Sequence, residues 1–289
     1  MTESENIELP ENYDALKDRI AERYPDLSKQ LQKIARFSLE SPNILALETI
    51  AAIAEQTGVQ PSSMVRFAQS LGFDGFSGMQ RVFRTQLVHQ SRSYQERIDG
   101  LRQSQFSSNS VYSRVLGEFV EEGRQALLQL RDHTEEKSLD KAVSILAKAE
   151  NIYVVAQKRA FPVAFYIHYA LGRLGQRCIL LDNIGGTLLQ QARLTTAKDA
   201  LIAISFPPYT PEVLDAVNAC TEQGTRIIAI TDTIISPIAL KSSLTFEIRQ
   251  QEDQAFRSLV APMCLAQSLV LSLGHVIADK RNGSTSHGK

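Results

Sequence analysis

Residues 50–71, IAAIAEQTGVQPSSMVRFAQSL, decide how the first third of the chain is interpreted. Apolar residues at helical spacing stop at Gly58, which can adopt the left-handed conformation of a tight turn. Pro61 suits the first turn of a second helix, because its missing N–H is not needed there. That second helix has four apolar residues spaced to face inward: Met64, Phe67, Ala68 and Leu71. The pattern predicts a helix-turn-helix, a motif whose second helix can enter the major groove of DNA.

The opposite face of the second helix carries polar side chains that suit contact with DNA. Arg66 could donate two hydrogen bonds to guanine, and Gln69 could pair with adenine. We expect Ser62 and Ser63 to face outward beside them, where they could reach phosphate or base edges. Two further contacts with the DNA backbone are expected from the following helix: Arg81 and Arg84. An ordinary helical hairpin with a solvated face has the same spacing, so the pattern alone leaves that alternative open.

The composition of the whole chain is that of a globular protein. Its 289 residues are 43% apolar and 22% charged, with a net charge of −1, which excludes a fibrous or wholly disordered chain. Three widely separated cysteines without a CxxC pair argue against a disulfide framework or a zinc finger. No uninterrupted apolar run approaches the roughly 20 residues of a membrane helix, and the acidic N-terminus is unlike a secretory signal. We therefore expect a cytoplasmic protein with no membrane segment.

From Asn151 onward, short apolar runs alternate with helical stretches. Apolar runs without alternation suit parallel strands that are covered on both faces. With helical crossovers between them, the runs predict a doubly wound α/β fold with a five-stranded parallel sheet. The expected strands are residues 152–156, 178–182, 200–205, 226–231 and 244–248. The expected helices outside the sheet are residues 13–24, 31–39, 111–131, 139–149 and 255–278.

Ligands of open parallel sheets bind beyond the carboxyl ends of the strands, near the point where the strand order reverses. Hydroxyl groups and backbone N–H groups at the start of a helix form a ready site for an anion. Ser205 and Thr210 lie on either side of a turn that leads into a helix near Pro211. The residues expected to bind a ligand there are Lys158, Arg159, Ser205, Tyr209 and Thr210.

The stretch GVQPSSMVRFAQSLGFDGFSGMQ resembles the N-terminal domain of the RpiR (MurR/RpiR) family of bacterial transcription regulators. Members typically read GVS-x-x-T-V-V-R-F-x-x-x-L-G-F-x-G-F. The matching residues are Gly58, Val59, Val65, Arg66, Phe67, Leu71, Gly72, Phe73, Gly75 and Phe76. Gln60 departs from the pattern, because members often carry a helix-capping Ser there; it could weaken the cap by roughly 1 kcal/mol or contact a base instead. The resemblance implies a regulator that binds double-stranded operator DNA.

The second half resembles the sugar isomerase (SIS) domain, which in RpiR regulators follows the DNA-binding domain and senses phosphorylated sugars. The turn at Ser205 and Thr210 and the run GTRIIAITDTIISPIA (224–239) carry this resemblance. The usual G-x-G-x-S loop is replaced by AQKRA (156–160), and the usual S-x-S-G-x-T by SFPPYT (205–210). The resemblance therefore implies a sugar-like effector, with or without a phosphate, and it leaves open a sheet kept for dimerisation alone. It also implies a homodimer or homotetramer on a pseudo-palindromic operator.

SIS domains also occur in isomerases, so a sugar-phosphate isomerase with a vestigial helical domain is the alternative. Isomerisation needs a general base, for which the candidates are Glu212, His168 and Glu252. His168 lies in an apolar helical stretch, where a satisfied core histidine is the more common role. A DNA-binding domain attached to a weakened sugar site favours sensing over catalysis. We assign no catalytic residue, cofactor or metal, and the chain contains no Walker loop or H-E-x-x-H motif.

These patterns divide the chain into four parts. Residues 13–90 are the expected helix-turn-helix domain, and residues 91–132 are a linker with a connecting helix. Residues 133–278 are the expected SIS-like domain, and residues 279–289 are a flexible tail.

Overall fold

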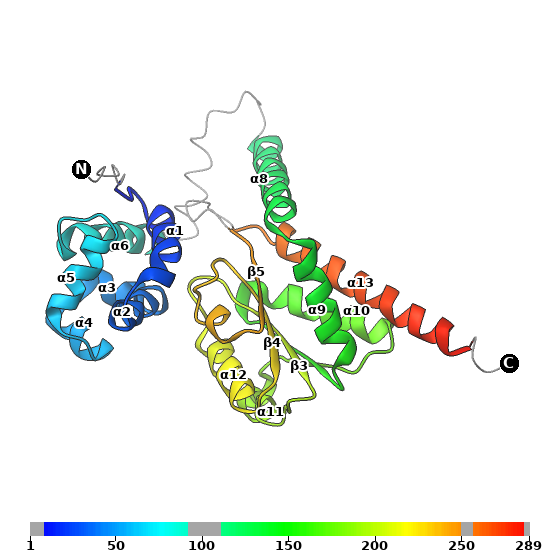
Figure 1. The fold of residues 1–289 in the computed structure, drawn as a ribbon. Helices are drawn as coiled ribbons and strands as arrows, with labels where there is room; N and C mark the ends of the chain where they lie inside the picture. The colour runs from blue at the N-terminus through cyan, green and yellow to red at the C-terminus, as the bar shows by residue number, and fades with distance from the viewer. Residues whose placement is uncertain (1–8, 92–110, 250–256, 286–289) are drawn as a thin grey trace, which may run out of the picture. The chain divides into compact units, whose positions relative to one another are not determined.

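The computed structural model describes residues 9–91, 111–249 and 257–285 and divides into two compact units (Figure 1). One unit contains the described residues up to Val111 together with Arg257, and the other contains the remaining residues from Tyr112 onward. The described part of the first unit is helical, and the second contains a parallel sheet with helices on both faces. Of the linker expected at 91–110, residues 92–110 lie outside the described residues.

The N-terminal unit is built from short helices, of which α1, α2 and α4 begin at residues whose side chains cap the helix. Thr49, for example, accepts a hydrogen bond from the backbone N–H of Ala52 at the start of α4. The predicted helices at 13–24 and 31–39 are confirmed, with ends that differ by no more than two residues. The helices are α1 (Tyr13–Arg23), α2 (Lys29–Glu40), α3 (Pro42–Leu47), α4 (Ile50–Thr57), α5 (Pro61–Ser70) and α6 (Phe76–Ser91).

The carboxyl end of α3 is closed by two side chains from α6. The Gln80 amide is buried and donates to the carbonyl oxygens of Leu45 and Glu48 at 3.0 and 2.8 Å. Arg84 donates through Nε to the Ala46 carbonyl at 2.8 Å, and its Nη2 donates to Gln80 Oε1 at 3.0 Å. Carbonyls in the last turn of a helix have no partner within the helix. These bonds therefore fix α3 against α6, and α3 leads directly into α4.

Replacing Gln80 by alanine is expected to lower the free energy of unfolding of the N-terminal unit by about 1–3 kcal/mol, because the Leu45 carbonyl would be left buried without its partner. Native-state hydrogen exchange of the α3 and α6 amides in the full chain measures this change. Gln69→Ala, on the exposed side of α5, is the matched control and should change exchange little. Equal protection in the two variants would contradict the capping role of Gln80.

The C-terminal unit contains the predicted five-stranded sheet. The strands are β1 (Ile152–Val155), β2 (Cys178–Leu181), β3 (Ala200–Ile204), β4 (Arg226–Thr231) and β5 (Leu244–Glu247). Their order is β2-β1-β3-β4-β5, and every neighbouring pair is parallel. The doubly wound prediction is confirmed, and each strand ends within one residue of its predicted end. The helices are α8 (Val111–His133), α9 (Glu136–Lys148), α10 (Phe161–Arg173), α11 (Leu188–Ala192), α12 (Pro211–Glu222) and α13 (Val260–Thr285).

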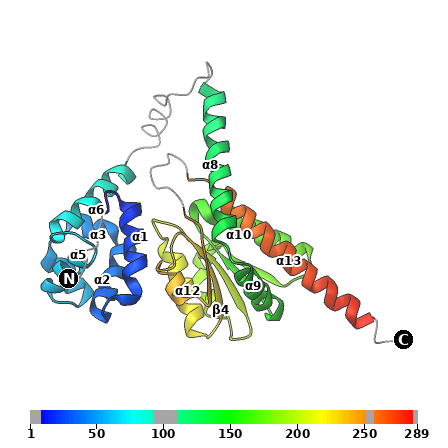
Figure 2. The ribbon, with the colours of Figure 1, turned by 45° about the horizontal axis from the view of Figure 1, so that its top comes forward.

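Side chains of β3 alternate between two hydrophobic cores. Ile202 and Ile204 pack with α9, α10 and α13 on one face, while Leu201 and Ala203 pack with α11 and α12 on the other. Figure 2 shows α9, α10 and α13 on one side of the sheet and α12 on the other. Because both faces are covered, every residue of β3 is buried and apolar, as the uninterrupted run of the sequence indicates.

The last helix departs from its prediction. It is described from Val260 to Thr285 rather than over 255–278, so the expected flexible tail is helical as far as Thr285. Residues 260–279 are also long and apolar enough, by length and composition alone, to cross a membrane, a test that the core helix of a soluble protein passes as well. Scattered Ser, Gln and Gly residues interrupt the apolar run without lowering its mean hydropathy below 1.7. The helix packs one face on the core through Leu265, Leu269 and Leu273.

Candidate functional site

The turn between α4 and α5 has the geometry that its sequence predicts. Gly58 ends α4 in the left-handed conformation, with φ of 65°. The Val59 N–H donates to the Ala54 carbonyl at 3.0 Å, which brings the chain back across the end of the helix. Pro61 is the first residue of α5. The two helices are therefore joined by a turn of three residues, 58–60, as a helix-turn-helix requires.

Behind this turn, the inward face of α5 is confirmed. Its predicted apolar residues are all fully buried: Met64, Phe67, Ala68 and Leu71. On α4, Ile53 and Ala54 are buried as well, at 0% and 2% exposure. Because the side chain of Ala54 is small, it allows α4 and α5 to approach each other closely.

The outward face of α5 presents Ser62, Arg66 and Gln69 to solvent. Ser63 does not join them, because it is only 5% exposed, and the prediction that it faces outward is wrong. Ser63 lies four residues before Phe67, so it shares the buried side of the helix. Its hydroxyl accepts a long hydrogen bond of 3.5 Å from Nη2 of Arg66.

Gln60 is the N-cap residue of α5 and makes no side-chain capping hydrogen bond. It is exposed, and so is the adjacent Ser62. The first N–H groups of a helix need partners from outside the helix when no side chain caps them. The start of α5 therefore keeps backbone donors and a partial positive charge that could meet a phosphate group.

The two arginines predicted on α6 have different surroundings. Arg81 is exposed, and among the described residues no hydrogen bond from its guanidinium is recorded. Arg84 is used to close the end of α3, as described above. Sequence spacing gave no sign of this second role, because the bonded carbonyl of Ala46 lies 38 residues away along the chain.

A pocket of about 100 Å³ lies at the carboxyl ends of β1 and β3. These central strands are neighbours, and the chain crosses from β1 to β2 on one side and to β3 on the other. This is the point where the strand order reverses, the expected place for a ligand. Nine residues line the pocket: Gln157, Lys158, Arg159, Ala160, Ser205, Phe206, Pro207, Pro208 and Thr210.

Four of the five predicted ligand-binding residues lie in this pocket, namely Lys158, Arg159, Ser205 and Thr210. Ser205 and Thr210 are 3% and 6% exposed, and the structure records no hydrogen bond of either hydroxyl to a described residue. Thr210 is also the N-cap residue of α12, and its hydroxyl does not cap the helix. Two buried hydroxyl groups and the start of a helix thus converge on the pocket, an arrangement that suits an anionic oxygen.

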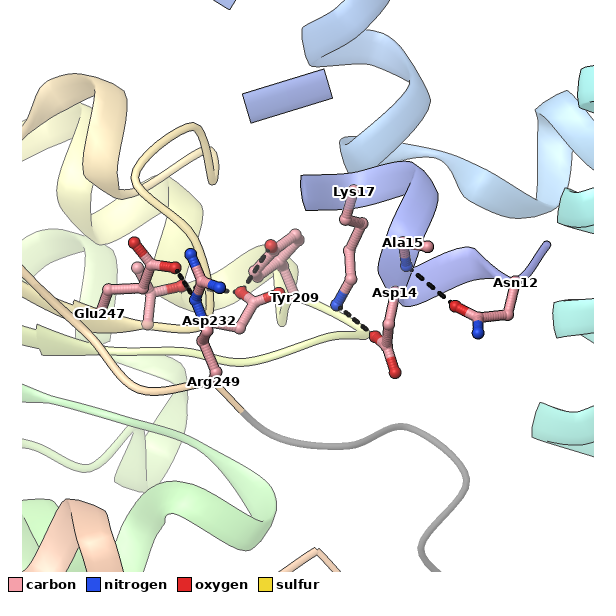
Figure 3. A network of polar contacts seen from close by, with 9 residues as sticks. Asn12, Asp14, Ala15, Lys17, Tyr209, Asp232, Glu247 and Arg249 are labelled. Carbon is pink, nitrogen blue, oxygen red and sulfur yellow. Dashed lines mark hydrogen bonds and ion pairs between the residues drawn. The ribbon is translucent and has the colours of Figure 1, made fainter. Parts of the chain in front are cut away.

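Tyr209 is the predicted residue that does not line the pocket. Its hydroxyl donates to Asp232 Oδ1 at 2.8 Å, as Figure 3 shows, and the Thr231 hydroxyl donates to the same oxygen at 3.1 Å. Asp232 follows β4 and is 7% exposed. These bonds link the β3–α12 loop to the end of β4, so Tyr209 supports the loop that carries Ser205 and Thr210.

Lys158 replaces a glycine of the usual SIS loop but keeps a glycine-like backbone. Its φ is 53°, in the left-handed region that residues with a Cβ rarely adopt. Its side chain is exposed at the pocket. Strained residues of this kind cluster at functional sites, because the surrounding structure must hold them.

Phe206 and Gln157 also line the pocket, outside the set of predicted ligand-binding residues. Phe206 is 6% exposed, and the guanidinium carbon of Arg159 lies over its ring, 5.6 Å from the centroid. Gln157 donates to the Leu181 carbonyl at 3.5 Å. The polar Gln157 next to Lys158 was a usable signal, whereas the contact of Phe206 depends on two loops 47 residues apart.

Neither of the described candidates for a general base, Glu212 and His168, is among the residues that line the pocket. Glu212 is exposed in the first turn of α12. His168 lies on α10 and is half-buried, and its Nδ1 is buried without a hydrogen-bond partner among the described residues. Glu252 lies outside the described residues.

The two units therefore define a helix-turn-helix DNA-binding domain joined to an α/β ligand-binding domain. Residues 15–90 match the model for the helix-turn-helix domain of the rpiR family, and residues 145–272 match the model for the SIS domain. The chain therefore combines a helix-turn-helix domain of the rpiR family with a SIS domain, the organisation of an RpiR-type transcriptional regulator.

Three similar proteins match most of this chain. The HTH-type transcriptional regulator YfhH of Escherichia coli K12 is 25% identical over 256 residues, which cover 88% of each chain. The bifunctional protein glk of Burkholderia thailandensis is 26% identical over 246 residues, and the match covers 83% of this chain but 36% of that protein. The solved structure of Vibrio vulnificus NanR complexed with ManNAc-6P has a TM-score of 0.54 and 20% identity, covering 94% of this chain and 96% of NanR.

Replacing Lys158 by glycine is expected to relieve the backbone strain, because glycine adopts a φ of 53° readily. Lys158→Gly should be about 1 kcal/mol more stable than Lys158→Ala, which removes the same amine but keeps a Cβ. Calorimetry of the thermal unfolding of the C-terminal unit compares the two variants. A glycine variant no more stable than the alanine variant would contradict the left-handed conformation of residue 158.

Proposed function

We propose that this chain binds operator DNA through α5 and that a sugar phosphate in the pocket at β1 and β3 changes this binding. The observation that supports the proposal most directly is the pair of buried hydroxyls, Ser205 and Thr210, at a pocket that also carries two cations. A regulator needs both a surface for DNA and a site for a signal. The described residues offer one candidate for each.

For DNA, α5 offers side chains that can read base edges. Arg66 and Gln69 are exposed and three residues apart, so they project from one side of the helix. Arg66 can donate to guanine O6 and N7, and Gln69 to adenine. Gln60 and Ser62 lie at the uncapped start of α5, where phosphate contacts would set the register. Ser63 and Arg84 are retained as weaker candidates, because Ser63 is buried and Arg84 closes α3.

For the effector, the pocket offers donors for a phosphate group. Lys158 and Arg159 supply positive charge, while Ser205 and Thr210 supply hydroxyl groups next to the start of α12. Tyr209 contributes indirectly by holding the same loop to Asp232. The NanR structure, solved with ManNAc-6P, provides a precedent for a sugar phosphate with a similar fold. We propose a phosphorylated sugar as the effector class.

We propose that the chain is a sensor rather than an isomerase. No carboxylate or imidazole is among the nine described residues that line the pocket, although isomerisation of a sugar needs a general base near C1 and C2. Glu212 is exposed on α12, and His168 is on α10 outside the lining. The pocket as described can therefore hold an anion but has no evident group for proton abstraction. A cytoplasmic location, where chromosomal DNA is available, follows from the proposed role.

We also propose that the regulator is a homodimer or homotetramer. The helix α8 carries large apolar residues that are exposed in the single chain: Tyr112 at 88%, Leu116 at 66% and Val120 at 62%. These residues are four apart and form one stripe. Exposed apolar stripes of this kind mark protein interfaces. A two-fold oligomer would present two α5 helices to a pseudo-palindromic operator, and sedimentation equilibrium measures the mass that decides this.

Arg66→Ala is expected to weaken binding to the operator by about 1–3 kcal/mol and to relax preference at one base pair. Arg81→Ala should weaken binding evenly across sequences and lower the salt slope by about one unit, because it would lose a phosphate contact. Binding is measured on promoter fragments selected from genomic DNA by the protein itself.

Arg226→Ala is the control for these variants, since Arg226 is exposed at the start of β4 in the other unit. It should leave the operator affinity and its salt dependence unchanged. A base preference retained in Arg66→Ala would remove α5 from its role as the recognition helix.

Ser205→Ala and Thr210→Val are expected to abolish the response of DNA binding to sugar phosphates, while binding without effector stays intact. The measurement is operator affinity with and without N-acetylmannosamine 6-phosphate and glucose 6-phosphate. The same incubations, followed by NMR, test for isomerisation. Conversion of either sugar phosphate by the wild-type chain would favour the enzyme, and a full response in both variants would place the effector elsewhere.

A further inference from the structure

Phe206 connects the two loops that form the pocket. It follows Ser205 directly at the end of β3, is 6% exposed and lines the pocket. Arg159 comes from the loop after β1 and is half-buried. Its guanidinium carbon lies over the Phe206 ring, 5.6 Å from the ring centroid. Since β1 and β3 are neighbouring strands, this contact spans the place where the strand order reverses.

A guanidinium over a ring is held without losing its hydrogen-bonding edge. The attraction to the ring acts through the face of the guanidinium plane, whereas its N–H groups point outward within that plane. An unrestrained arginine side chain loses up to about 2 kcal/mol of rotamer entropy when a ligand orders it. A ring that already orders the side chain removes much of this loss, which strengthens binding of an anion.

The pocket also has few other strong donors on the β1 side. Ala160 has no hydroxyl group, and the Lys158 amine is on an exposed side chain with no recorded ring contact in the described structure. Ser205 and Thr210 supply hydroxyls from the β3 side. Arg159 is therefore the cation in the lining with a recorded ring contact, and its planar fork matches two phosphate oxygens.

We propose that Phe206 is a positioning residue that holds Arg159 for the phosphate group of a sugar phosphate. The inference rests on the proposed function of this pocket. It assigns a role to Phe206, whose ring makes no hydrogen bond with the effector. Phe206 acts through Arg159, so its effect on binding disappears when the Arg159 charge is absent.

A double-mutant cycle on the full chain tests this dependence. Calorimetric titration with N-acetylmannosamine 6-phosphate, glucose 6-phosphate and inorganic phosphate gives the affinity of each variant. Arg159→Met keeps an unbranched apolar side chain and removes the charge, and Phe206→Leu keeps an apolar side chain and removes the ring. Arg193→Met is the matched control, since Arg193 is exposed and does not line the pocket.

Arg159→Met should weaken phosphate binding about tenfold or more, and Phe206→Leu about threefold to thirtyfold. Adding Phe206→Leu to Arg159→Met should cause no further loss. Phe206→Tyr should bind about as tightly as the wild type, because tyrosine keeps the aromatic ring that leucine lacks. Arg193→Met should also bind like the wild type. Circular dichroism checks that each variant is folded, and Phe206→Met takes the place of the leucine variant if the latter is not.

Three results would overturn the inference. Unchanged binding in Phe206→Leu would remove the role of the ring. Losses that multiply in the double variant would show that Phe206 acts independently of Arg159, and the proposed effector site would still stand. If the wild type binds operator DNA but none of the three phosphate probes, both the inference and the proposed effector class fail.

Discussion

The adjacency of β1 and β3 is the constraint on which the pocket depends. The chain leaves β1 toward β2 and returns on the other side of β1 to form β3, so the loops after these two strands separate. The sheet can keep this arrangement because the side chains of β3 fill two cores, Ile202 on one face and Leu201 on the other. With both faces covered by helices, the open space for a ligand is at the strand ends. The topology brings the loops after β1 and β3 together at these strand ends, and the loops carry Lys158, Arg159 and Ser205.

In the N-terminal unit, the corresponding constraint is the need to satisfy the last carbonyls of α3. Gln80 and Arg84 do this from α6, and they thereby fix the segment that leads into α4. The α4–α5 turn then needs little besides Gly58 and the inward face of α5. The proposed DNA surface on α5 is thus supported by polar bonds between α3 and α6, and one basic residue of this unit, Arg84, serves its packing.

Much of the fold could be predicted because its residues repeat with a period. The buried strands have uninterrupted apolar runs, and the inward face of α5 has helical spacing. Ser63 shows the limit of such spacing, because it lies three residues before Arg66 on the outward face and four residues before Phe67 on the buried face. The contacts of Arg84 and Phe206 have no local signal, since each joins segments that are far apart in the sequence. Periodicity gives the direction of a side chain, but the partner it meets depends on the packed fold.

The left-handed backbone at Lys158 has a consequence for how this loop can change over evolutionary time. Its φ of 53° is imposed by the strand before it and the helix after it, since the residue itself disfavours this conformation. Replacing a glycine there by a charged residue therefore alters the chemistry of the pocket wall at a cost of about 1–2 kcal/mol, without a new loop shape. A single substitution at this position can thus change the pocket wall from neutral to charged. A family that retains its sheet can diversify the signals it detects through such single positions.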